Sequence, residues 1–190
     1  MRLFVALDID EAIQQRLDDY VRTLQPRLPG VRFVRSNTYH VTLKFLGEVP
    51  KADTVRERLR EVRATSFQIT VGGVGFFPNA RAPRVFWAAI NAPELAELAH
   101  CVDRSLEGLG FPQEREFNPH LTLARNGSGR PRPLHNERPP VSFAQLPGIV
   151  ASSPAPEFGT MAAREFFLYE SRLSSSGPSY SKLEGYKLAC

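Results

Sequence analysis

The sequence predicts an α+β fold: two pseudo-symmetric lobes of antiparallel β-sheet, with helices outside and a cleft between the lobes. Two observations support this. Segments with the two-residue alternation of strands are interspersed with segments whose apolar residues recur at helical spacing. The motif His-aliphatic-Thr-Leu occurs at His40–Leu43 and again, eighty positions later, at His120–Leu123, each time after a helical segment and a polar turn. We therefore expect residues 1–190 to form a single bilobal domain.

Short apolar runs bounded by Gly, Pro, Asn or Asp predict the strands of the first half. They lie at 1–10, 31–34, 39–46, 67–74 and 84–90. Apolar residues at helical spacing predict two helices, over 11–28 and about 52–62, and Pro29-Gly30 should end the first of them. Turns are expected at Ser36-Asn37 and at 76–79.

The second half repeats the pattern with a helix over 92–109 and a strand at 119–124. Residues 126–140 are rich in Gly, Pro, Arg and Asn, which predicts a long basic loop. No long element is expected within 142–160, because Pro147, Gly148, Pro154 and Pro156 interrupt it. Strands at 164–171 and 183–188 should close the fold as an antiparallel pair, joined by a segment rich in Ser, Gly and Pro.

Composition indicates an ordinary globular protein, with 42% hydrophobic and 23% charged residues. Its apolar runs fall short of the roughly 18 residues that span a bilayer, and the N-terminal run is too short and too acidic for a signal peptide. Cys101 and Cys190 have no metal-type spacing, so neither a disulfide framework nor a zinc site is implied. We expect a cytoplasmic protein without a membrane partner, and take a monomer as the default. A net charge of +4 is compatible with a phosphate-bearing ligand but does not specify one.

The repeated motif is the main functional signal. Alternate side chains of a strand share a face, so His40 and Thr42 should point to one side, and His120 and Thr122 likewise. Two such strands facing each other would bring two imidazoles together, which suits proton transfer near neutral pH. Each histidine alone could simply lie on a solvated strand face. By residue usage, however, the motif should match only about one window in ten thousand, so two copies favour a site.

The flanks of the motifs carry a resemblance to a known family. Arg2–Ala6, His40–Gly47 and Pro119–Arg125 resemble the two-histidine phosphoesterase superfamily, and within it the bacterial and archaeal RNA 2′,3′-cyclic phosphodiesterases, also called 2′-5′ RNA ligases. The similarity continues to 168–171 and Tyr180, whereas 126–163 resembles nothing in particular. The resemblance implies hydrolysis of a 2′,3′-cyclic phosphate, on an RNA end or a small nucleotide, to a 2′-phosphomonoester. It also implies weak reverse 2′-5′ ligation and no requirement for a metal or cofactor.

The resemblance also implies roles for the motif residues. Opening a cyclic phosphodiester needs a base for water and an acid for the departing ribose oxygen. By similarity, His120 is the proton acceptor and His40 the proton donor, although the sequence does not fix that order. The hydroxyls of Thr42 and Thr122 can donate to the non-bridging phosphate oxygens as charge builds on them.

Four other residues are weaker candidates for substrate binding. Arg125 matches a family position where a guanidinium approaches the phosphate, but strand alternation places it on the face opposite His120. Lys44 shares alternation with His40, so it could line the cleft or lie on its rim. Tyr180 and Phe4 could stack on a base or belong to the core.

Two rival functions stay open. One is an RNA-joining enzyme whose main direction is 2′-5′ ligation, although the sequence has no P-loop or nucleotide-binding lysine motif to supply energy beyond the cyclic phosphate. The other is a non-catalytic nucleotide-binding or RNA-binding module on the same scaffold. Intact His and Thr in both motifs disfavour the second rival, because binding alone does not need a paired acid and base.

Overall fold

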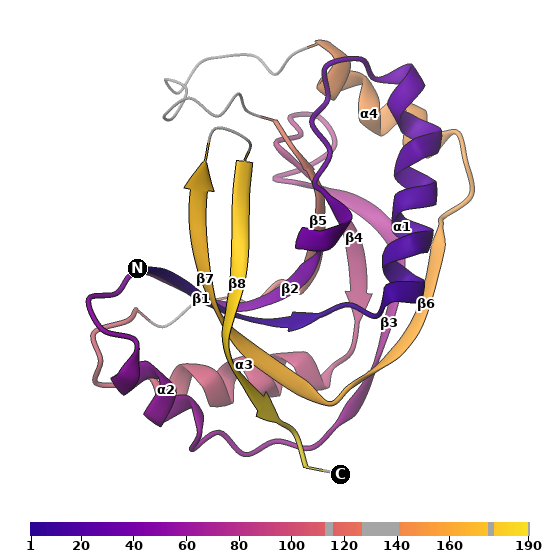
Figure 1. Cartoon of the computed structure of the whole chain (residues 1–190). Coiled ribbons are helices and arrows are strands. Elements are labelled where there is room, and N and C mark those ends of the chain that lie inside the picture. Colours follow the sequence, from indigo (N-terminus) through magenta and orange to yellow (C-terminus); the bar gives the residue numbers. More distant parts are fainter. Residues whose placement is uncertain (113–115, 127–140, 175–176, 190) are drawn as a thin grey trace.

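The computed structural model describes residues 1–112, 116–126, 141–174 and 177–189, with only the backbone of 141–142 (Figure 1). The strands are β1 (Arg2–Asp8), β2 (His40–Glu48), β3 (Phe67–Phe77), β4 (Val85–Asn91), β5 (His120–Arg125), β6 (Glu157–Ala163), β7 (Glu165–Ser174) and β8 (Gly177–Lys187). The helices of this described part are α1 (Glu11–Leu24), α2 (Asp53–Leu59), α3 (Glu94–Ser105) and α4 (Val141–Ala151).

The strands form two four-stranded antiparallel sheets, ordered β2-β1-β7-β8 and β5-β4-β3-β6. This confirms the predicted α+β class. The pseudo-symmetry lies in two strand-helix-strand units, β1-α1-β2 and β4-α3-β5, in which the second strand pairs with the first and forms the sheet edge. The lobes are not the two halves of the chain, however, because β3 belongs to the second sheet while β7 and β8 return to the first.

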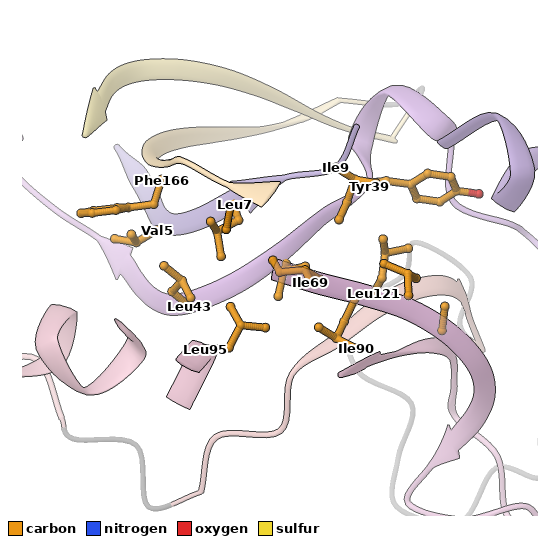
Figure 2. Packing of buried hydrophobic residues seen from close by; sticks show 14 of the residues in the cluster. Val5, Leu7, Ile9, Tyr39, Leu43, Ile69, Ile90, Leu95, Leu121 and Phe166 are labelled. Atoms are coloured by element: carbon orange, nitrogen blue, oxygen red, sulfur yellow. The ribbon is translucent and has the colours of Figure 1, made fainter. Parts of the chain in front are cut away.

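One hydrophobic core connects the two lobes. Figure 2 shows Val5 and Leu43 of the first sheet on the same core as Ile69, Ile90 and Leu121 of the second. Helices also contact the opposite sheet: α1 lies against β6 of the second sheet, and α3 lies against β2 of the first. Packing of this kind fixes the position of each sheet relative to the other.

Several predicted boundaries differ from the structure. Helix α1 ends at Leu24 and is followed by a 3₁₀ turn at Gln25–Arg27, because Pro26 has no backbone N–H for an α-helical bond. The strand expected at 31–34 is wrong: Phe33 makes only an isolated bridge to Ala124. Strand β3 continues to Phe77, into the region where a turn was expected.

The largest error concerns 142–160, where the structure has α4 and the start of β6. Pro147 lies inside α4. An internal proline costs a helix about 3 kcal/mol, but Phe143 and Leu146 are buried in the core, and their burial offsets this cost. The closing β7–β8 pair is also longer than predicted, from Glu165 to Lys187, because β8 is an edge strand that tolerates Pro178.

Most of the basic loop expected at 126–140 lies outside the described residues. Among the helices of the described part, none is long and apolar enough to cross a bilayer.

Candidate active site

The two His-Thr motifs line one cleft where the edge strands β2 and β5 come together. His40 and Thr42 face the cleft from the first sheet, and His120 and Thr122 face it from the second. The other lining residues are Val34, Thr38, Phe45, Arg125 and Tyr180. The convergence expected from strand alternation is therefore present.

Both imidazoles are held in the same way. Nδ1 of His40 lies 2.7 Å from the carbonyl oxygen of Thr38, and Nδ1 of His120 lies 2.8 Å from that of Asn118. A carbonyl only accepts, so Nδ1 carries the hydrogen in each ring. Nε2 of each neutral ring is left with a free lone pair, which is the atom needed for proton transfer.

Burial lowers the pKa of both histidines below the usual 6.5. At His40, the hydrogen bond to Thr38 and the carboxylate of Asp8 oppose this lowering of the pKa, while Arg125 and His120 add to it. At His120, the hydrogen bond to Asn118 opposes burial and Arg125 adds to it. Both rings therefore favour the neutral form at pH 7, and a bound phosphate anion would favour protonation of either.

A β-bulge in β2 changes which residues face the cleft. Ala6 of β1 pairs with Thr42, but the next residue back, Val5, pairs with Lys44, so one residue of β2 is passed over. Such a bulge reverses the alternation of the strand. Phe45, 58% exposed, consequently faces the cleft, and Lys44 does not.

An equivalent bulge occurs in β5. Trp87 of β4 pairs with Thr122, whereas the preceding Phe86 pairs with Ala124. Arg125 therefore joins the cleft face, contrary to its predicted position. Its Nη2 atom donates to Oγ1 of Thr122 at 3.3 Å. Phe45 and Arg125 are thus equivalent positions, each five residues after its motif histidine.

The expectation that Lys44 lines the cleft or its rim is wrong. Its side chain is 2% exposed and forms an ion pair with Asp103 of α3. Nζ also donates to the carbonyl oxygen of Pro112 at 2.8 Å. The bulge turns this residue into the core, where it joins β2 to α3 of the other unit.

Aromatic rings support His40 from the sheet below. Phe4 is 2% exposed, and its ring centroid lies 4.9 Å from that of His40. Phe4 stacks on Tyr169, at 5.0 Å, within a small cluster separate from the main core. Tyr180 packs edge-on against His40 at 5.1 Å and borders the cleft. Phe4 is therefore a buried support, and Tyr180 is accessible to a ligand.

His120 has a comparable neighbour. The ring of Phe77 meets it edge-on, with centroids 5.0 Å apart. Trp87 lies 5.0 Å from Phe77 and passes over Gly75, where an added Cβ would come within 2.3 Å of the indole. A side chain at Gly75 would displace Trp87.

Sequence reasoning missed Asp8. Antiparallel pairing places it opposite His40, and the two residues line a second hollow next to the cleft. The hydroxyl of Tyr169 and Nζ of Lys182 both donate to its carboxylate. Asp8 could have been found from the expected pairing of the end of β1 with the start of β2, which places it opposite His40. Phe45 gave none, because the bulge is not readable from the residue pattern.

Among the residues that the structure describes, no three His, Cys, Asp or Glu side chains are grouped to hold a metal ion. The polar side chains that line the cleft carry two imidazoles, one guanidinium and the hydroxyls of Thr38, Thr42, Thr122 and Tyr180. This set can transfer protons at two points and donate hydrogen bonds to an anion between them.

Comparison with known proteins agrees with this arrangement. The sequence matches the family described as LigT like phosphoesterase over residues 7–87 and 89–180, which includes both motifs. The chain belongs to the LigT-like phosphoesterase family. An RNA 2′,3′-cyclic phosphodiesterase of Archaeoglobus fulgidus is 36% identical over 190 residues, which cover 98% of this chain and all of that protein. The corresponding enzyme of Thermotoga maritima is 32% identical, with 96% of this chain and 93% of that protein covered.

Solved structures of the family share the fold. E. coli LigT complexed with NADP+ superposes with a TM-score of 0.75 at 26% identity, over 100% of this chain and 98% of that chain. E. coli LigT complexed with 3′-AMP gives a TM-score of 0.74 at 27% identity, over 98% and 97%.

Proposed function

We propose that this phosphoesterase hydrolyses the terminal 2′,3′-cyclic phosphate of RNA, or of a small cyclic nucleotide, to a 2′-phosphomonoester. The observation that carries the proposal is the pair of imidazoles, each with Nδ1 bound to a backbone carbonyl and Nε2 free, at one cleft. The similarity to the RNA 2′,3′-cyclic phosphodiesterases described above supports the same reaction. NADP+, found with E. coli LigT, carries a 2′-phosphomonoester, the group formed as product.

In the proposed mechanism, His120 accepts a proton from water and the water oxygen bonds to phosphorus. The bond from phosphorus to O3′ breaks on the opposite side, and His40 gives its proton to O3′. One water is consumed, and both histidines return to their starting states after proton exchange with solvent. The protein's own side chains suffice for these transfers, so we expect no loss of activity with a chelator.

The remaining cleft residues act on charge and on orientation. Thr42, Thr122 and Arg125 donate hydrogen bonds to the non-bridging oxygens, which gain negative charge in the transition state. Tyr180 and Phe45 border the same cleft, where their faces suit stacking of the terminal base. If a 5′-hydroxyl attacked phosphorus in place of water, the same steps would give slow 2′-5′ ligation.

The first test is turnover of a short RNA ending in a 2′,3′-cyclic phosphate, with EDTA present and with the product identified by ³¹P NMR. We expect a 2′-phosphate. His40→Ala and His120→Ala should each lower kcat by about 10²- to 10⁴-fold, the usual contribution of general acid–base catalysis. His100→Ala, at an exposed position of α3, is the matched control and should retain activity.

A 3′-phosphate product would show that the bond from phosphorus to O2′ breaks instead, and that the substrate binds in the opposite orientation. Turnover that survives both motif substitutions would overturn the mechanism. A folded protein that binds this RNA without turning it over would favour the binding-module alternative.

A further inference from the structure

The immediate supports of the two histidines are closely matched. Each histidine bonds the carbonyl two residues before it, and each has an aromatic ring packed against it at nearly the same centroid distance: 4.9 Å from Phe4 to His40 and 5.0 Å from Phe77 to His120. Both strands also carry the same bulge. A symmetric pair of imidazoles has no reason to divide into an acid and a base, so a difference between the halves must do this.

Arg125, whose counterpart is Phe45, lowers the pKa of both histidines and so does not distinguish them. The cross-strand neighbour of each histidine does. Asp8 of β1 pairs with His40, and at the equivalent place in the second sheet Ala89 of β4 pairs with His120. An anion beside one imidazole stabilises the imidazolium there, and a methyl group beside the other does not.

The Asp8 carboxylate is held in place from the neighbouring strands. Tyr169 of β7 donates its hydroxyl to one oxygen, and Lys182 of β8 forms an ion pair with the other. Burial and the hydrogen bond to Asp8 raise the pKa of Tyr169, so its hydroxyl stays protonated and remains a donor. Lys182 also neutralises part of the negative charge that His40 experiences.

Among the other groups facing His40, the carbonyl of Thr38 favours its protonation, but that of Asn118 does the same for His120, so these carbonyls do not distinguish the two rings. Arg125 and His120, both on β5, lower the pKa of His40. Tyr180 of β8 has a pKa raised by burial and stays neutral at the pH of the reaction. Asp8 is the negative charge that acts against them.

We propose that Asp8 is a positioning residue that keeps the reaction's proton on His40, and thereby makes His40 the proton donor and His120 the base. This inference rests on the proposed function. It assigns roles that the near-symmetric motifs leave undecided, and it gives the Tyr169–Asp8–Lys182 contacts a purpose beyond stability.

The test uses two substitutions that change the charge near His40 in opposite senses. Asp8→Asn removes the anion but keeps an acceptor for Tyr169, so protonated His40 should become less stable. Lys182→Gln removes the neutralising cation, so protonated His40 should become more stable. We expect the titration of the His40 imidazole, followed by NMR, to move by about half a pH unit downward in the first variant and upward in the second.

The activity profile should move with the titration. In the profile of kcat against pH, activity falls at high pH as His40 loses its proton. This high-pH limb should shift to lower pH in Asp8→Asn and to higher pH in Lys182→Gln. His120 should titrate unchanged in both. Asp10→Asn, the same change of charge two residues along the chain, is the control and should leave His40 unchanged.

The outcomes separate the two proposals. Loss of activity in both variants without movement of the His40 titration would show a merely structural network and overturn the inference. Equal movement of His40 and His120 would overturn it as well. If the unmodified protein has no His-dependent turnover, the proposed function fails, while the His40 titration still reports on Asp8.

Discussion

At the scale of single residues, the site depends on a few polar atoms whose partners are backbone carbonyls or neighbouring side chains. The carbonyl oxygens of Thr38 and Asn118 decide which nitrogen of each imidazole faces the cleft. Arg125 and Phe45 occupy equivalent positions and differ completely in chemistry. One presents a cation to the cleft, and the other presents a flat apolar face.

Arg125 gives a prediction at this scale. A guanidinium donates at several points in one plane, and a lysine ammonium does not reproduce this geometry. We expect Arg125→Lys to lower kcat/KM by about tenfold and Arg125→Ala by about a hundredfold, within the range for loss of a transition-state donor. Steady-state kinetics on a nucleoside 2′,3′-cyclic phosphate measures both.

Arg22→Ala, on the exposed surface of α1, is the control for the loss of one positive charge. Equal activity of Arg125→Ala and this control would show that Arg125 does not contribute to catalysis.

At the scale of elements, the two bulges explain both the success and the failure of sequence reasoning. Simple alternation places His40 and Thr42 together correctly, because the bulge comes after them. It fails for Lys44 and Arg125, because each lies past the irregularity. The residues that are passed over, Leu43 in β2 and Leu123 in β5, are apolar like those expected to face the core, so nothing in the residue pattern shows where the pairing is interrupted.

Helix α4 shows a second limit of local patterns. Pro147 argues against a helix at the level of propensity, and the structure has one because buried Phe143 and Leu146 anchor it. Contacts distant in sequence decide such cases. The strongly periodic α1 and α3 are predicted correctly in position, with errors only at their ends.

The buried pair between β2 and α3 gives a prediction about stability. Lys44→Met leaves Asp103 without its cation, and removal of one partner from a buried pair costs about 3–5 kcal/mol of unfolding free energy. Lys44→Met combined with Asp103→Leu removes both charges and should recover most of that loss. Urea denaturation measures all three proteins.

Lys187→Met, at an exposed position of β8, serves as the control. A loss in Lys44→Met no larger than in this control would mean that the pair does not stabilise the contact between β2 and α3.

At the scale of the whole molecule, the sequence pattern predicts two lobes and their cleft but not how the chain distributes its strands between them. The missing information is the pairing of β1 with β7 and the crossing of β3 into the second sheet. Such long-range pairings depend on the complete set of core contacts. Local periodicity does not contain them.

The shared core predicts cooperative unfolding of residues 1–190 as one domain. Trp87 is the only tryptophan of the chain and reports on the second sheet, whereas far-UV circular dichroism reports on both. We expect the two signals to give coincident urea transitions, as in a two-state protein. A separate, earlier Trp87 transition would show that the lobes unfold independently.

The pairing of β1 with β7 also affects the order of events on the ribosome. Strand β1 is synthesised first, but the edge that faces β7 has no partner until Tyr169 can pair with Phe4 and Phe167 with Ala6. Until β7 emerges, a nascent chain has an open, strongly apolar strand edge, a surface prone to aggregate. A chain stalled before residue 165 would already contain both histidine motifs, yet lack Tyr169, Tyr180 and Lys182 around His40.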